Sequence, residues 1–148
     1  MIAGLLICDH VIEEYQTQFG DYPEMFISLF PEFEWREYDV MNGAYPGDIN
    51  DCDVYFTTGS RHSAYEDLDW IRGLEVFIRR LYDSEKYFIG VCFGHQVMGQ
   101  AMGGVVEKSS KGWCVGVHQF DIIEKADWMI PMLDEIRILM MCQDQIMT

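Results

Sequence analysis

The chain has 148 residues, of which 49% are hydrophobic and 14% aromatic, and this is enough to bury one sizeable core and to exclude a disordered chain. Its 25 Asp and Glu outnumber 10 Lys and Arg, and the formal net charge of −15 argues against nucleic acid and anionic membranes as partners. The five cysteines are widely spaced without a CxxC pair, and Met1–Cys8 is apolar without a basic flank, so we expect reduced thiols, no signal peptide and a cytoplasmic protein.

Short apolar runs alternate with stretches of helical spacing along most of the chain. In order, we expect a strand at 2–8, helical residues at 11–30 split near Gly20 and Pro23, strands at 34–40 and 53–58, a helix at 67–82, a strand at 87–91 and a helix at 93–102. Strands at 105–108 and 113–123, a short helical piece at 128–133 and a strand at 136–141 complete the prediction. This order indicates one domain over residues 1–148 with a three-layer α/β fold and a mostly parallel sheet. Asp9 is expected to cap the first helix, beside a turn residue, His10.

The most informative stretch is Gly90-Val91-Cys92-Phe93-Gly94, which joins an apolar strand to a helix. Small residues on both sides of a central nucleophile, between a strand and a helix, are typical of a nucleophile elbow, in which flanking glycines permit a sharp turn and leave room for substrate. A lone cysteine after an apolar strand is more often an inert core residue. Because four features of an elbow coincide here, we interpret Cys92 as a nucleophile.

A cysteine at this position would benefit from the helix that follows it. Unpaired N–H groups and the helix dipole favour the thiolate, which is the attacking form. The backbone N–H of Phe93 would point toward the oxygen of an attacked carbonyl and supply half of an oxyanion hole, worth about 3 kcal/mol. The second donor must come from another loop.

Three motifs resemble the class I glutamine amidotransferase family. Gly90 to Gln96, followed by Gln100-Ala101-Met102-Gly103-Gly104, is similar to its G-x-C-x-G-H-Q signature and the helix after it. Thr58-Gly59-Ser60 resembles the oxyanion loop of a branch with G-S in place of G-G-P, and 111–117 resembles the K-G-W-x-x-G segment of that branch. That branch includes stand-alone amidotransferase-like proteins and γ-glutamyl peptidases. The resemblance implies a three-layer flavodoxin-like fold.

The resemblance also implies a reaction and its residues. Cys92 would attack the side-chain carbonyl of glutamine or a γ-glutamyl compound, giving a thioester that water hydrolyses to glutamate. The N–H groups of Phe93 and Ser60, with Gly59 shaping the loop, would form the oxyanion hole, and Gln96 would help to hold the substrate. For Gln96, an ordinary amide on the helix surface remains the alternative.

The sequence departs from the family in one important respect. The family places its base and orienting acid in a late His-x-Glu motif, and these 148 residues contain no such triplet. Residues 138–146 resemble the strand and turn that precede that motif, so we expect the C-terminal part of the domain to be missing and the chain alone to be inactive. His95, His62, His118 and His10 are poor replacements for the base: the last two read as structural or turn residues, and His62 as a residue of the substrate rim or surface.

Two classes of function therefore remain open. The first is a cysteine hydrolase of γ-glutamyl amides, either a stand-alone peptidase, which the K-G-W segment favours, or a glutaminase that delivers ammonia to a partner synthetase. The second is an inactive pseudo-glutaminase that acts as a regulatory or binding module. We expect a small-molecule substrate, no cofactor, no metal site and no nucleotide site, because neither ligand spacing nor a phosphate loop is present.

Overall fold

The computed structural model describes residues 1–147 except 111, 128, 130–134 and 143–144. The chain divides into two compact units, Lys108–Gln145 and the remainder, and each is described separately; the expectation of a single domain stays a prediction. The strands are β1 (Ile2–Ile7), β2 (Glu34–Asp39), β3 (Val54–Thr57), β4 (Tyr87–Gly90), β5 (Val106–Lys108), β6 (Cys114–Asp121), β7 (Glu135–Cys142) and β8 (Gln145–Met147). The α-helices are α1 (Glu13–Phe19), α2 (Tyr22–Leu29), α3 (Asp69–Asp83) and α4 (Phe93–Ala101), and short 3-10 helices occupy Val40–Asn42 and Ile49–Asp51.

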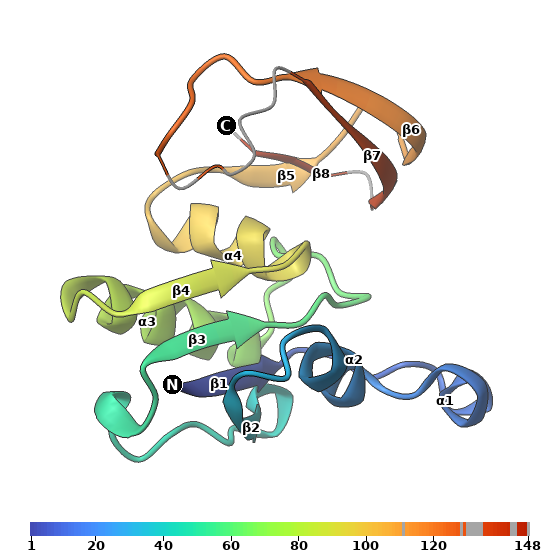
Figure 1. Ribbon diagram of the computed structural model, residues 1–148. Coiled ribbons are helices and arrows are strands. Elements are labelled where there is room, and N and C mark those ends of the chain that lie inside the picture. The colour runs from blue at the N-terminus through green and yellow to red at the C-terminus, as the bar shows by residue number, and fades with distance from the viewer. Residues whose placement is uncertain (111, 128, 130–134, 143–144, 148) are drawn as a thin grey trace. The chain divides into compact units, whose positions relative to one another are not determined.

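The larger unit is built on a parallel sheet with the strand order β2-β1-β3-β4 (Figure 1). β1 and β3 are almost wholly buried, as expected from their continuous apolar sequences. Because the strands are parallel, the loops that follow β1, β3 and β4 leave the same edge of the sheet. The predicted α/β fold with a mostly parallel sheet is confirmed, and in open α/β sheets ligands generally bind beyond the carboxyl ends of the strands.

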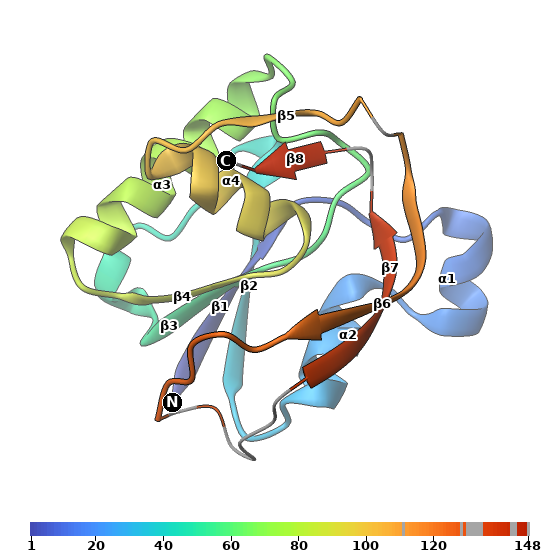
Figure 2. The same ribbon diagram turned by 90° about the horizontal axis from the view of Figure 1, so that it is seen from above.

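The sheet has a hydrophobic core on each face, which makes the unit three-layered. Leu6, Tyr55 and Phe93 belong to the core shared with α3 and α4. Leu5 and Phe56 point to the other face, where α2 contributes Phe26 and partly buried aromatic rings complete the cluster. Figures 1 and 2 show α3 and α4 on one side of the sheet and α2 on the other. The alternation along β1 thus fixes which helices cover which face.

The predicted helical stretch at 11–30 forms two helices, as Gly20 and Pro23 indicated. Gly20 ends α1 with φ 76, a conformation that favours glycine. Asp21 then caps α2 in a capping box with Glu24. The expectation that Asp9 caps the first helix is wrong: Ile12 occupies the N-cap position of α1 without a side-chain hydrogen bond, because the Asp9 carboxylate binds Arg61 instead.

The smaller unit contains β6 and β7, which pair antiparallel from Cys114↔Cys142 to Asp121↔Glu135. Both strands were expected, although their pairing was not. β5 pairs with β8, a strand that the apolar pattern did not predict. The helical piece expected at 128–133 lies outside the described residues, apart from Met129.

Candidate active site

Cys92 lies at the turn between β4 and α4 in a strained backbone conformation. Its φ of 51 and ψ of −103 place it in a region that non-glycine residues rarely adopt, and Cys92 is the residue that directly precedes α4. Such strain costs about 1–3 kcal/mol and is concentrated at functional sites. Of the three cysteines whose side chains the structure describes, Cys8 and Cys52 are buried and Cys92 is exposed. The geometry therefore matches the predicted elbow, with the thiol presented to solvent.

The two glycines of the elbow make room for the sharp turn through their missing Cβ atoms and not through a positive φ. Neither Gly90 nor Gly94 has a positive φ; the turn's left-handed residue is Cys92 itself. A Cβ on Gly94 would lie 1.6 Å from Thr57 Oγ1, and a Cβ on Gly90 would lie 2.7 Å from the backbone of Gly94 and His95. The glycines thus allow α4 to pack directly on β3 and β4, with the turn between β4 and α4 at Cys92.

Phe93 begins α4 and is fully buried. Its ring packs on Trp70 of α3 with a centroid distance of 5.4 Å, so the first turn of α4 is fixed against the core. The first N–H groups of an α-helix have no carbonyl partner within the helix and form a suitable site for negative charge. This arrangement is compatible with the Phe93 N–H acting as an oxyanion donor.

The loop after β3 lies directly beside Cys92. β3 pairs with β4 in a register that joins Thr57 to Gly90, so Gly59 and Cys92 follow neighbouring strand ends. A Cβ on Gly59 would lie 3.8 Å from the Cys92 Cβ. We call residues 59–64 the oxyanion loop, after the role that the sequence predicts for them. The structure therefore brings together the predicted residues Gly59, Cys92 and Phe93, with Ser60 next in the chain.

An ion pair that the sequence did not reveal holds the oxyanion loop. The Asp9 carboxylate is 5% exposed and accepts hydrogen bonds from the Arg61 backbone N–H at 2.7 Å and from its guanidinium Nη2 at 2.8 Å. Burial by itself would raise the pKa of Asp9, but the hydrogen bonds from Arg61 outweigh it and lower the pKa. Asp9 therefore stays ionised and ties the loop to the end of β1. The sequence offered one clue to this pair, which is the position of each residue just after a predicted strand; the two strands are neighbours in the sheet.

His62 and His10 are engaged elsewhere in the described structure. His62 Nδ1 lies 3.1 Å from Glu66 Oε2, and its ring stands edge-on to Trp70 at 5.5 Å. Because Trp70 also contacts Phe93, His62 connects the oxyanion loop to the elbow by packing. His10 pairs with Asp21 at 2.5 Å.

The remaining predicted residues are less constrained. Gln96 is half-buried in the first turn of α4, where its N–H donates to the Cys92 carbonyl at 3.2 Å. That position lies near the elbow, and its role in holding a substrate stays a prediction. His95 is exposed on the same turn, and the side chain of His118 lies outside the described residues.

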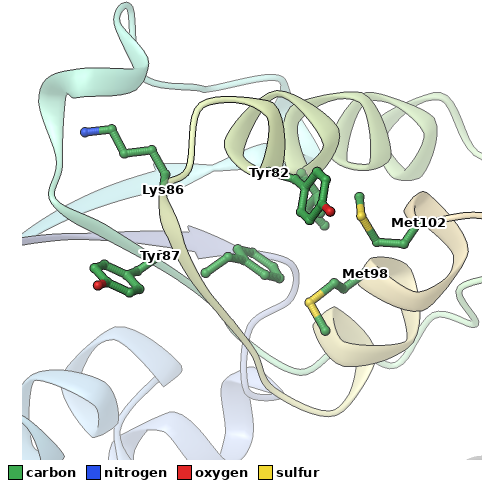
Figure 3. Close-up of a pocket in the computed structure, with 7 residues that line it drawn as sticks. Tyr82, Lys86, Tyr87, Met98 and Met102 are labelled. Atoms are coloured by element: carbon green, nitrogen blue, oxygen red, sulfur yellow. The ribbon is translucent and has the colours of Figure 1, made fainter.

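A hollow lies at the end of β4 that is farther from Cys92 (Figure 3). It has a volume of about 330 Å³ and a mostly apolar lining that includes Tyr82 of α3, Met98 of α4 and Met102, with Lys86 as its charged residue. Its β4 residues, Tyr87 and Phe88, begin the strand whose other end leads to Cys92, and Met102 follows the far end of the helix that begins after Cys92. This hollow is therefore separate from the elbow and the oxyanion loop.

Comparison with known proteins agrees with this geometry. The family described as glutamine amidotransferase class-I matches residues 57–127, a range that begins in β3 and includes the oxyanion loop and the elbow. γ-Glutamyl peptidase 4 of Arabidopsis thaliana is 33% identical over 112 residues, which are 73% of this chain and 45% of that protein. γ-Glutamyl peptidase 3 of the same plant is 34% identical over 123 residues, 80% of this chain and 48% of that protein.

The chain belongs to the class I glutamine amidotransferase family. Its fold is that of a glutamine amidotransferase from Thermotoga maritima, with a TM-score of 0.77 at 16% identity over 99% of this chain and 62% of the other. A glutamine amidotransferase from Methylobacillus flagellatus has a TM-score of 0.75 at 20% identity over 99% of this chain and 57% of the other.

This amidotransferase-like chain spans about half the length of the curated relatives that it matches. In the part of the chain that the structure describes, no helix combines the length and the apolar character that a membrane crossing requires.

Proposed function

We propose that this amidotransferase-like chain carries the nucleophile of a cysteine hydrolase that cleaves γ-glutamyl amides. The observation that carries the proposal is the strained, exposed Cys92 at the start of α4, with Gly59 of the oxyanion loop against it. The printed names of the relatives, γ-glutamyl peptidases 3 and 4, support a substrate of this class. The proposal extends to glutamine, whose side chain is the simplest γ-glutamyl amide.

In the proposed reaction, the Cys92 thiolate attacks the γ-carbonyl carbon and the carbonyl oxygen becomes negatively charged. The N–H groups of Phe93 and Ser60 would stabilise that charge, and Gln96 would hold the glutamyl group. The carbon–nitrogen bond then breaks, the nitrogen leaves as an amine or ammonia after gaining a proton, and a thioester remains on Cys92. Water attacks the thioester, which releases glutamate and regenerates the thiol.

Proton transfer is the step that the 148 residues supply least well. They contain no His-x-Glu triplet, and the described structure directs His10 to Asp21 and His62 to Glu66. We therefore expect the chain alone to be acylated slowly and to turn over little. The K-G-W segment at 111–113 favours a stand-alone γ-glutamyl hydrolase over a glutaminase that feeds a synthetase.

Modification by 6-diazo-5-oxo-L-norleucine, a glutamine analogue that alkylates nucleophiles, tests the proposal. We expect one adduct, mapped to Cys92 by peptide mass spectrometry, that excess L-glutamine suppresses and Cys92→Ser abolishes. The D-enantiomer is the matched control and should react far more slowly. Equal rates for the two enantiomers, or an adduct on another cysteine, would overturn the proposed function and favour a binding module.

A further inference from the structure

A hollow next to the oxyanion loop has no place in the reaction described so far. Its volume is about 380 Å³, and its walls are the segment 9–12 after β1, Tyr15 of α1, Tyr22 of α2, and Ser60 and Arg61 of the oxyanion loop. All of these residues belong to the larger unit. Volumes of this order are typical of small-molecule sites.

The hollow lies close to Cys92. Ser60, one of its walls, follows Gly59, whose added Cβ would stand 3.8 Å from the Cys92 Cβ. Tyr22, on another wall, is within electrostatic range of Cys92: burial raises the pKa of Tyr22, and negative charge on Asp9 and Cys92 adds to the increase. The hollow and Cys92 therefore both adjoin the oxyanion loop.

The lining indicates what kind of group fits. Val11, Ile12, Tyr15 and Tyr22 make it largely apolar, and Ile12 and Tyr15 are 57% and 47% exposed. α1 buries none of its residues, so it does not hold Tyr15 there by packing into the core. An exposed apolar wall gains free energy when a ligand covers it.

The charged groups that line the hollow already have partners, either in the hollow or next to it. Arg61 binds Asp9 through its guanidinium and its backbone, and His10 binds Asp21 at 2.5 Å. The α-ammonium and α-carboxylate of a glutamyl group would lose hydration here without gaining an unpaired partner. An uncharged apolar group would suffer no such penalty.

We propose that this hollow is the subsite for the amine side of the substrate, and that it selects γ-glutamyl amides whose nitrogen bears an aromatic or branched aliphatic group. The inference rests on the proposed function, because it assumes a γ-carbonyl at Cys92. It adds a preference among γ-glutamyl compounds that the elbow and oxyanion loop alone do not determine.

Binding to the Cys92→Ala chain tests the subsite without turnover. Isothermal titration with Nγ-benzyl-L-glutamine and Nγ-methyl-L-glutamine should give at least about a tenfold lower Kd for the benzyl compound, a ratio in the range expected for burying an aromatic ring. Tyr15→Ala and, separately, Ile12→Ser should reduce this ratio at least threefold. Tyr82→Ala removes an exposed tyrosine from the other hollow and is the matched control, in which the ratio should stay the same.

Three results would overturn the inference, and they have different meanings. If both amides bind with the same Kd while the glutamine analogue still alkylates Cys92, the subsite is wrong and the proposed function stands. If neither amide binds and Cys92 does not react with the analogue, the proposed function and the subsite both fail. An unchanged ratio in Tyr15→Ala and Ile12→Ser would place the benzyl group outside this hollow.

Discussion

At the scale of single residues, the strained backbone conformation of Cys92 should lower the stability of the chain while it presents the thiol to solvent. A φ of 51 is unfavourable for any residue with a Cβ and acceptable for glycine. We predict that Cys92→Gly is more stable to urea than Cys92→Ala, by about 1 kcal/mol. At Val76, an exposed position within α3, the glycine variant should instead be less stable than the alanine variant, because glycine is the poorer helix residue. Equal or greater stability of Cys92→Ala would mean that the turn is not strained.

The close packing around Gly94 leads to a second prediction for a single residue. Because an added Cβ would lie 1.6 Å from Thr57 Oγ1 in a buried contact, Gly94→Ala should destabilise the chain by about 3 kcal/mol, the range of overpacked cores. Gly47→Ala is the matched control, since nothing lies within 4 Å of its added Cβ, and it should change the free energy of unfolding by less than about 0.5 kcal/mol. Urea titration of both variants gives the comparison. Similar values would show that α4 does not pack on β3 as described.

Local patterns made Cys92 and its glycines recognisable in the sequence, because strand, turn and helix follow one another within a few residues. The contact that requires Gly94 was not recognisable, since it involves Thr57, which lies in the neighbouring strand. The Asp9–Arg61 pair was missed for the same reason: its members are 52 residues apart and meet only because β1 and β3 are adjacent. Asp9 looked like a helix cap because local spacing favours that interpretation.

At the scale of elements, the Asp9–Arg61 pair should keep the oxyanion loop in place. Asp9→Asn removes the charge that holds Arg61, so we predict roughly a tenfold slower modification of Cys92 by the glutamine analogue, which needs the oxyanion donors. Iodoacetamide requires no oxyanion hole, and its rate should change much less. Asp83→Asn, on an exposed residue of α3, is the matched control for loss of a carboxylate. A uniform slowing with both reagents would indicate loss of structure instead of loss of positioning.

The His10–Asp21 pair ties the segment before α1 to the start of α2, and its contribution should depend on pH. The hydrogen bond that His10 donates to Asp21 raises the pKa of His10, so the stabilisation is fully present below the unfolded pKa of about 6.5 and is lost as the pH rises through the higher folded value. Since the His10 side chain is 44% exposed, we expect His10→Ala to cost only about 0.5 kcal/mol at about pH 5.5 and less at about pH 9. Urea titrations at both values, with His95→Ala as control, measure the difference. A cost that grows with pH would contradict this assignment.

Periodicity in the sequence predicted most of the helices and strands, but it did not predict which strands pair. The break between α1 and α2 was predicted from Gly20 and Pro23, because backbone constraints act locally. The pairings of β6 with β7 and of β5 with β8 depend on contacts between residues distant in sequence. Alternation within one strand carries no information about its partner.

At the scale of the molecule, the outer strand of the parallel sheet is unusually apolar for its exposure. Within the described residues β4 pairs only with β3. Tyr87 and Ile89 of β4 are 76% and 45% exposed, and Val91, just after the strand, is 40% exposed. Open apolar edges promote association with other strands. We predict that the chain self-associates with rising concentration and that Ile89→Lys suppresses this, as measured by sedimentation velocity. Ile123→Lys makes the same charge change at a position that is 94% exposed and outside the sheet, and it should leave association unchanged.

The account as a whole depends on transfer of a γ-glutamyl group to Cys92, and intact-mass spectrometry of the chain incubated with γ-glutamyl-p-nitroanilide measures this transfer directly. p-Nitroaniline is a weakly basic leaving group, so this substrate depends least on a proton donor. We predict a mass increase of one γ-glutamyl group, located on Cys92, together with release of one equivalent of p-nitroaniline. An unmodified chain, or a γ-glutamyl group on a residue other than Cys92, would contradict the account.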